Sequence, residues 1–205
     1  LVVLDAQLAV GSLQTGEIQL IDRRSGRLEA DISPGPDTAI VGGGTDGFER
    51  AIMGGKAPRS MVWSRSVQRL FVASIGPNIG PNPERMEVSM NGGVGVISPA
   101  SGTFDRHVGF GAGVTDALAL DDARGLLYAA DTALGIVRVL DVHRLVGTEA
   151  EAADAVVRTF EVTPPEDFPT LRPPRDFGIK GRAGLSLHSG PTAIVLGEGG
   201  AVHVL

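Results

Sequence analysis

The sequence has 205 residues, a net charge of −6, 29 glycines, 13 prolines and no cysteine. Without cysteine these residues cannot form disulfides, thiolate metal sites or a CxxCH haem attachment. The sequence also has no Lys/Arg cluster suited to nucleic acid and no apolar run of about 20 residues that would span a membrane. A chain rich in glycine and proline, with Val, Ile and Leu as its main apolar residues, is typical of many short strands joined by turns.

Four units of one design follow each other along the chain, each with up to four strands that we name a to d in chain order. The first unit, 1–33, is predicted to have strands at 1–4, 7–12, 16–22 and 26–33. The second unit, 60–109, is predicted to have strands at 60–64, 69–74, 93–98 and 102–109. The third unit, 117–162, has them at 117–121, 126–131, 135–141 and 157–162. The fourth, 192–205, has only 192–196 and 200–205.

The units match one another at fixed spacing. In the a–b hairpin, Ser60–Ser74 aligns with Ala117–Asp131, and 1–12 and 191–205 are shorter copies. In strand c, apolar residues occupy the same three columns, which are Ile18, Val94 and Val137; Leu20, Val96 and Val139; and Ile21, Ile97 and Leu140. Asp22 and Asp141, at the ends of strand c, are predicted to accept hydrogen bonds within the turns that follow.

Strands such as 136–140 are apolar almost throughout, which indicates burial on both faces. A single unit cannot cover its own faces, so neighbouring units must cover them. The sequence therefore predicts an all-β fold, a β-propeller built from four-stranded antiparallel blades. It is expected to be incomplete in this chain, because closed propellers have roughly four to eight blades and about three and a half are present here. We expect the remaining blades from a longer protein or from another subunit.

Three segments carry a resemblance to a known family. They are 124–131, 135–141, and Gly16–Asp22 followed by Ser25-Gly26. Their pattern resembles the YVTN-type β-propeller repeat of bacteria and archaea, across the strand cores of all four units. The resemblance implies a propeller fold and an extracytoplasmic location, in the periplasm or at the cell surface. Some members of that family are fused or paired with c-type cytochrome or peroxidase-like modules, and related propellers include lactonases and dehydrogenases.

Most of the long insertions are predicted to emerge on one face of the propeller. The d–a insertions 34–58 and 163–190 and the b–c insertion 75–91 share that face, whereas only the c–d insertion 142–156 lies on the other. Long loops on a rigid scaffold commonly carry binding sites. We therefore expect the ligand or partner site on this d–a/b–c face, and we expect deletion of 75–91 to spare folding and abolish binding.

Two groups of side chains are candidates on that face. The binding-face candidates are Arg85, Arg172, Arg175, Lys180, Arg182 and His188, of which the basic cluster 172–182 could receive an acidic partner or a carboxylate. Nearby acidic residues nearly balance this cluster, so a solvated loop is the favoured alternative. Oxygen ligands for calcium are offered by Asn78, Asn82, Glu84 and Glu87. The favoured alternative is that the Asn and Pro residues there only form turns.

The sequence predicts no catalytic residue and no cofactor within these residues. It favours a non-catalytic scaffold or binding module with a protein partner. The alternative is a part of a propeller enzyme or electron-transfer protein, cytochrome- or peroxidase-associated or lactonase-like, whose cofactor ligands lie outside this segment.

Overall fold

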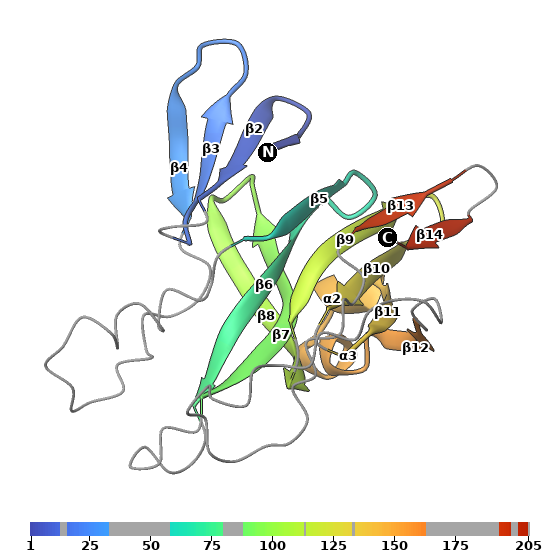
Figure 1. The fold of residues 1–205 in the computed structure, drawn as a ribbon. Coiled ribbons are helices and arrows are strands. Elements are labelled where there is room, and N and C mark those ends of the chain that lie inside the picture. Colours follow the sequence, from blue (N-terminus) through green and yellow to red (C-terminus); the bar gives the residue numbers. More distant parts are fainter. Residues whose placement is uncertain are drawn as a thin grey trace, which may run out of the picture.

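The computed structural model describes residues 1–12, 16–32, 58–79, 88–112, 114–132, 134–162, 193–197 and 201–204, without the side chains of 74–79, 88–91 and 111–112. Three four-stranded antiparallel sheets and one two-stranded sheet follow one another along the chain, each with its strands in sequence order (Figure 1). We call them blades 1 to 4.

Blade 1 contains β1 (Val2–Val3), β2 (Gln7–Gly11), β3 (Ile18–Asp22) and β4 (Leu28–Ile32). Blade 2 contains β5 (Ser60–Ser64), β6 (Arg69–Ile79), β7 (Val88–Ser98) and β8 (Thr103–Ala112). Blade 3 contains β9 (Thr115–Asp121), β10 (Leu126–Asp131), β11 (Ile136–Asp141) and β12 (Val156–Glu161). Two short helices, α2 (Val142–Val146) and α3 (Glu149–Ala153), join its last two strands, and blade 4 contains β13 (Ile194–Leu196) and β14 (Val202–Val204).

The first strand of each blade lies next to the first strand of the following blade. β1 contacts β5, β5 contacts β9, and β9 contacts β13. Three clusters of buried hydrophobic residues lie between successive blades. Sheets that stack face to face around their first strands are the blades of a β-propeller, so the predicted fold is confirmed for the described residues.

Successive side chains of one strand enter different interfaces. In β6, Leu70 and Val72 pack in the cluster shared with blade 1, whereas Phe71 and Ala73 pack in the cluster shared with blade 3. All four are fully buried. The period of two that places neighbours on opposite faces thus operates on a sheet whose two faces are both covered, as the apolar pattern predicted.

Turn residues fix where the strands end. Asp22 Oδ1 accepts hydrogen bonds from the backbone N–H groups of Arg24 and Ser25, and Asp141 Oδ1 accepts them from His143 and Arg144 at the start of α2. Both predicted turn acceptors are confirmed. The side-chain hydrogen bond from Ser25 is the main reason that the pKa of Asp22 lies below its ordinary value.

The b–c connection of blade 2 differs from the prediction. Strands were expected to end at 74 and restart at 93, but β6 and β7 remain paired as far as Ile79 and Val88. Gly and Pro in this stretch suggested a loop. Backbone pairing does not depend on side-chain polarity, so the ladder started by the buried part of β6 continues through them.

Candidate functional site

The residues predicted to bind a partner or calcium lie almost entirely outside the described residues. The backbone of Asn78 belongs to β6 and pairs with Ser89, but its side chain is not described. The remaining candidates are also outside the description, namely Asn82, Glu84, Arg85, Glu87, Arg172, Arg175, Lys180, Arg182 and His188. Their role in binding remains a prediction.

A cleft of about 380 Å³ lies on this face between blades 1 and 2. It is formed where β1 and β5 begin and β2 ends, and its lining residues are Leu1, Val2, Gly11, Pro58, Arg59, Ser60 and Met61. Gly11 allows the two blades to approach, because a Cβ atom at this position would lie 2.6 Å from Cγ of Pro58. The backbone N–H of Arg59 donates to the carbonyl oxygen of Ala73 at 3.0 Å. The wall of the cleft is thereby attached to β6.

Arg59 is the charged residue among those that line the cleft. Its side chain is 48% exposed, and its Nε lies 3.8 Å from Oδ1 of Asp116, at the start of β9. The other carboxylate oxygen of Asp116 accepts a hydrogen bond from the hydroxyl of Thr132. A guanidinium carries five N–H donors, and about half of the surface of this side chain is open to solvent beside its long contact with Asp116. Arg59 can therefore bind a carboxylate from a ligand or partner.

A second charged pair lies deeper at the same end of blade 3. Arg138 donates to Asp131 Oδ2 at 2.8 Å, and Asp131 is completely buried. Asp131 Oδ1 also accepts from the backbone N–H groups of Val114 and Leu134, and the guanidinium of Arg138 lies 4.9 Å from the ring centre of Phe110 in blade 2. Both charges are thus partnered by groups of the protein itself, and loss of either partner would leave a buried charge uncompensated.

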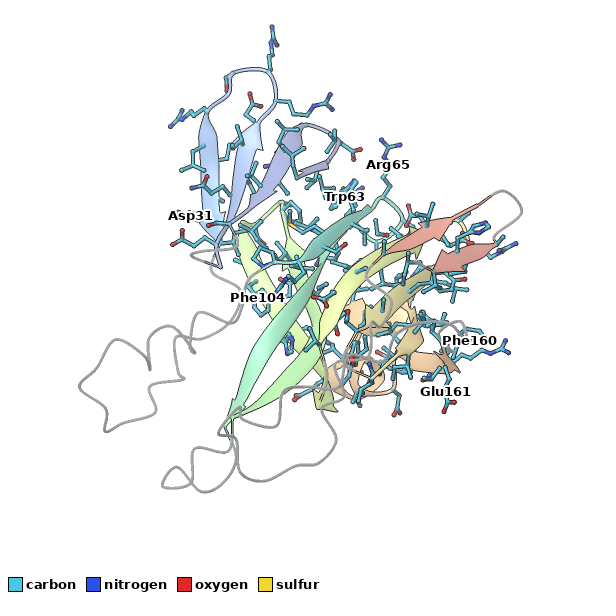
Figure 2. All side chains as sticks on the ribbon, viewed as in Figure 1. Asp31, Trp63, Arg65, Phe104, Phe160 and Glu161 are labelled. Atoms are coloured by element: carbon cyan, nitrogen blue, oxygen red, sulfur yellow. The ribbon has the colours of Figure 1, made fainter. Side chains whose placement is uncertain are left out.

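The opposite face, where the a–b turns lie, is held by polar contacts between blades. The carboxylate of Asp122 accepts hydrogen bonds from the hydroxyls of Ser64 and Ser66, at 2.6 and 2.7 Å, and from the backbone N–H groups of Arg65 and Ser66. Partial burial alone would raise the pKa of Asp122, but these hydrogen bonds outweigh it and hold the pKa below 3.8. Arg65 in turn pairs with Asp5 of blade 1 at 3.2 Å, and Figure 2 shows Arg65 at this turn of blade 2. The a–b turns of three blades are thus linked in series.

Within the described ranges, no three His, Asp or Glu side chains come together as metal ligands would. Among the same residues, neither helix has the length and apolarity needed to cross a membrane.

Sequence reasoning missed Arg59, Asp116 and the Asp131–Arg138 pair. Arg59 directly follows Pro58 at the start of strand a, on the face that was predicted to bind. That position in the repeat could have identified Arg59 as a candidate binding residue. The pairing of Asp131 with Arg138 had no signal of its own, because an Asp at the end of strand b also fits a turn acceptor.

Comparison with known proteins assigns no family. No protein-family model and no curated protein matches the chain. Among solved structures, the chain is similar to that of U3-55K, with a TM-score of 0.47 and 14% sequence identity, over 77% of this chain and 36% of the other. The chain thus spans little more than a third of that structure, and a similarity at this level carries no argument about function.

Proposed function

We propose that this chain is a β-propeller binding module that receives an acidic group of a protein partner on its d–a/b–c face. The carrying observation is the cleft between blades 1 and 2, which has the half-exposed Arg59 in its wall. An acidic group that enters the cleft would form charge-assisted hydrogen bonds with this guanidinium.

The framework around the cleft supports this proposal. Pro58 and Gly11 pack closely, and Arg59 is attached to β6 through its backbone. Asp116 restrains the guanidinium from blade 3. A side chain that is already positioned loses less conformational entropy on binding than a free one, so this arrangement favours recognition over a solely structural role.

The family and location form part of the same proposal. Membership of the YVTN-type propellers and an extracytoplasmic location rest on the repeat pattern of the sequence. Cell fractionation with an antibody against the chain tests the location. Recovery of the protein in the periplasmic or surface fraction is expected, and recovery in the cytoplasm would contradict it.

The function is tested by affinity capture with covalent cross-linking from extracts of the source organism. The purified chain and its Arg59→Gln variant are compared, with Arg24→Gln as the matched control, because Arg24 is exposed in the β3–β4 turn on the opposite face. A specific partner should be retained by the unmodified chain and by Arg24→Gln, and should be reduced about tenfold or more with Arg59→Gln. Equal recovery of the same proteins by all three chains would refute the proposal.

The b–c connection of blade 2 provides a second test. The strand pairing shows that deletion of 75–91 would remove paired residues of β6 and β7. The suitable variant therefore replaces only 80–87 with a short Asn-Gly turn between Ile79 and Val88, which pair directly. We expect this variant to fold as the unmodified chain does and to lose partner binding. Unchanged binding would place the site at the cleft alone.

A further inference from the structure

One cross-strand row of side chains recurs in the first three blades. It takes one residue from each strand, near the a–b turn, and the pairing register defines it. In blade 2 the row is Trp63, Leu70, Ile97 and Phe104. In blade 3 it is Leu120, Leu127, Leu140 and Val156. In blade 1 it is Val3, Leu8, Ile21 and Leu28. We call this set the leading row of each blade.

The preceding blade covers the two central members of the leading row in blades 2 and 3, whereas Val156, at the outer end of the row in blade 3, is 38% exposed. Leu70 and Ile97 belong to the cluster that contains Ile18 and Leu20 of blade 1, and both are fully buried. Trp63 and Phe104 pack against the same cluster (Figure 2). In blade 3, the central members of the row pack in the same way against side chains of blade 2, as Leu127 and Leu140 do against Phe71 and Val96.

The leading row of blade 1 has the same chemistry without the same cover. Val3 is 52% exposed and Leu28 is 49% exposed. Leu8 and Ile21, between them, are only partly buried, although their counterparts in blades 2 and 3 are fully buried. None of the four belongs to a buried cluster of the described residues. Four aliphatic side chains side by side across a sheet form a continuous apolar surface, and such surfaces mark interaction sites.

We propose that the leading row of blade 1 is the docking surface for a further four-stranded blade from outside residues 1–205. The interfaces already formed in the chain define the occupant, because the central residues of the leading rows of blades 2 and 3 are covered by the uncharged trailing face of the blade before. In blade 2 that face consists of Phe71, Ala73, Val94 and Val96. The occupant should present a face of the same Ala, Val and Phe character.

A second copy of the chain fits this surface poorly. The trailing faces of blades 1, 2 and 3 are each covered by the next blade of the same chain. Blade 4 does expose Val195, which pairs with His203, but only two strands of blade 4 lie within the described residues. Two strands would leave much of a four-stranded row exposed, so a complete blade is the better partner.

The sequence contains no cysteine. The reaction rate of a single introduced cysteine therefore measures the exposure of that one position. Leu28→Cys probes the leading row, and Leu134→Cys is the matched control, since both leucines are 49% exposed and Leu134 lies outside the row. The probe blade is a second copy of residues 58–112, joined by a flexible linker to the amino end of the complete chain. This segment already covers a leading row, that of blade 3.

Docking of the probe blade should protect Leu28→Cys from 5,5′-dithiobis(2-nitrobenzoate). We expect its thiol to react about tenfold more slowly, or slower still, in the extended chain than in the unextended one, because reaction then requires local opening. Leu134→Cys should react at the same rate in both chains. Addition of Leu8→Asp to the extended Leu28→Cys chain should restore fast reaction, because docking would bury an unpaired carboxylate.

Two results would overturn the proposal. The first is fast reaction of Leu28→Cys both in this extended chain and in a second one that carries a copy of residues 114–162 instead. The second is slow reaction of Leu28→Cys in the unextended chain together with a doubled mass in light scattering, which would assign the surface to a second copy.

Discussion

Blades 1 and 3 are two copies of one design in different surroundings. Strand c carries Ile18, Leu20 and Ile21 in blade 1 and Val137, Val139 and Leu140 in blade 3. In both blades strand c follows a glycine with positive φ, 76° at Gly16 and 66° at Gly135. The N–H group of each glycine closes the same backbone turn, onto Ser12 and Asp131 respectively. Equivalent sequence has therefore produced equivalent local structure.

The two blades differ in what covers them. Blade 3 lies between blades 2 and 4, and its hydrophobic residues belong to two clusters, one for each face. Blade 1 contributes to one cluster only. Blade 3 also contains the buried pair of Asp131 and Arg138, where blade 1 has Ser12 and Gln19 in the equivalent positions. The comparison shows that the neighbours of a repeat determine how deeply its matched apolar residues are buried.

Among the variants that test this comparison, Asp131→Ala should lower the stability most. The substitution leaves the charge of Arg138 buried without its partner and removes an acceptor from two backbone N–H groups. We expect a loss of about 3–5 kcal/mol in the free energy of unfolding, measured by urea denaturation. Ser12→Ala, at the equivalent place in blade 1, should lose about 1 kcal/mol or less. Similar losses for both variants would contradict the view that blade 3 depends on this pair.

Truncation of the leading row should have the next largest effect. Leu140→Ala removes a fully buried side chain from the interface of blades 2 and 3, and we expect it to cost about 2–5 kcal/mol. Ile21→Ala makes a similar change in the partly buried row of blade 1, and should cost about 1 kcal/mol. Urea denaturation of the two variants measures the difference. Equal costs would mean that blade 1 is covered as fully as blade 3.

The repeat pattern was sufficient to predict most of the fold. The columns that align Ile21, Ile97 and Leu140 placed the core of strand c in blades 1, 2 and 3, although β7 begins at Val88 and not at 93. The pattern could not distinguish the partly buried Ile21 from the fully buried Leu140, because exposure depends on what lies beside the sheet. It also ended β6 too early, because Gly and Pro are common in loops and backbone pairing leaves no clear mark in the sequence.

The candidate site was less predictable than the fold. The choice of the d–a/b–c face came from loop lengths, and the cleft lined by Arg59 lies on that face. Arg59 itself could not be selected, because its contact with Asp116 joins residues 57 positions apart in sequence across two blades. Contacts of this kind depend on the stacking angle of the blades, which no local pattern specifies.

The two polar contacts between the a–b turns should differ less in their contributions to stability. Asp122→Ala removes four hydrogen bonds, including the one that the buried Ser64 donates to the carboxylate, so we expect a loss of about 1–3 kcal/mol in the free energy of unfolding. Asp5→Ala breaks an ion pair with Arg65 whose side chains are mostly exposed, and should lose less than about 0.5 kcal/mol. Thermal and urea unfolding of both variants measure these values. A larger loss for Asp5→Ala than for Asp122→Ala would indicate that the exposed ion pair of Asp5 and Arg65 contributes strongly to the stability of the interface between blades 1 and 2.

The smallest expected effect is the response of the Asp122 link to acid. The hydrogen bonds from Ser64, Ser66 and Arg65 hold the pKa of Asp122 below 3.8 in the folded protein, despite the opposing effect of partial burial. A lowered pKa means that the ionised carboxylate stabilises the fold fully above the pKa of the unfolded chain, and that this contribution disappears as the pH falls through the folded value. The unmodified chain should therefore lose its stability advantage over Asp122→Asn as the pH is lowered below about 4.

The pKa values of Asp22 and Glu151 are lowered as well. Both groups are present in the unmodified chain and in Asp122→Asn, so the difference between the urea midpoints of the two chains isolates Asp122. Midpoints that stay a constant distance apart from neutral to acidic pH would show that the Asp122 hydrogen bonds do not depend on its charge.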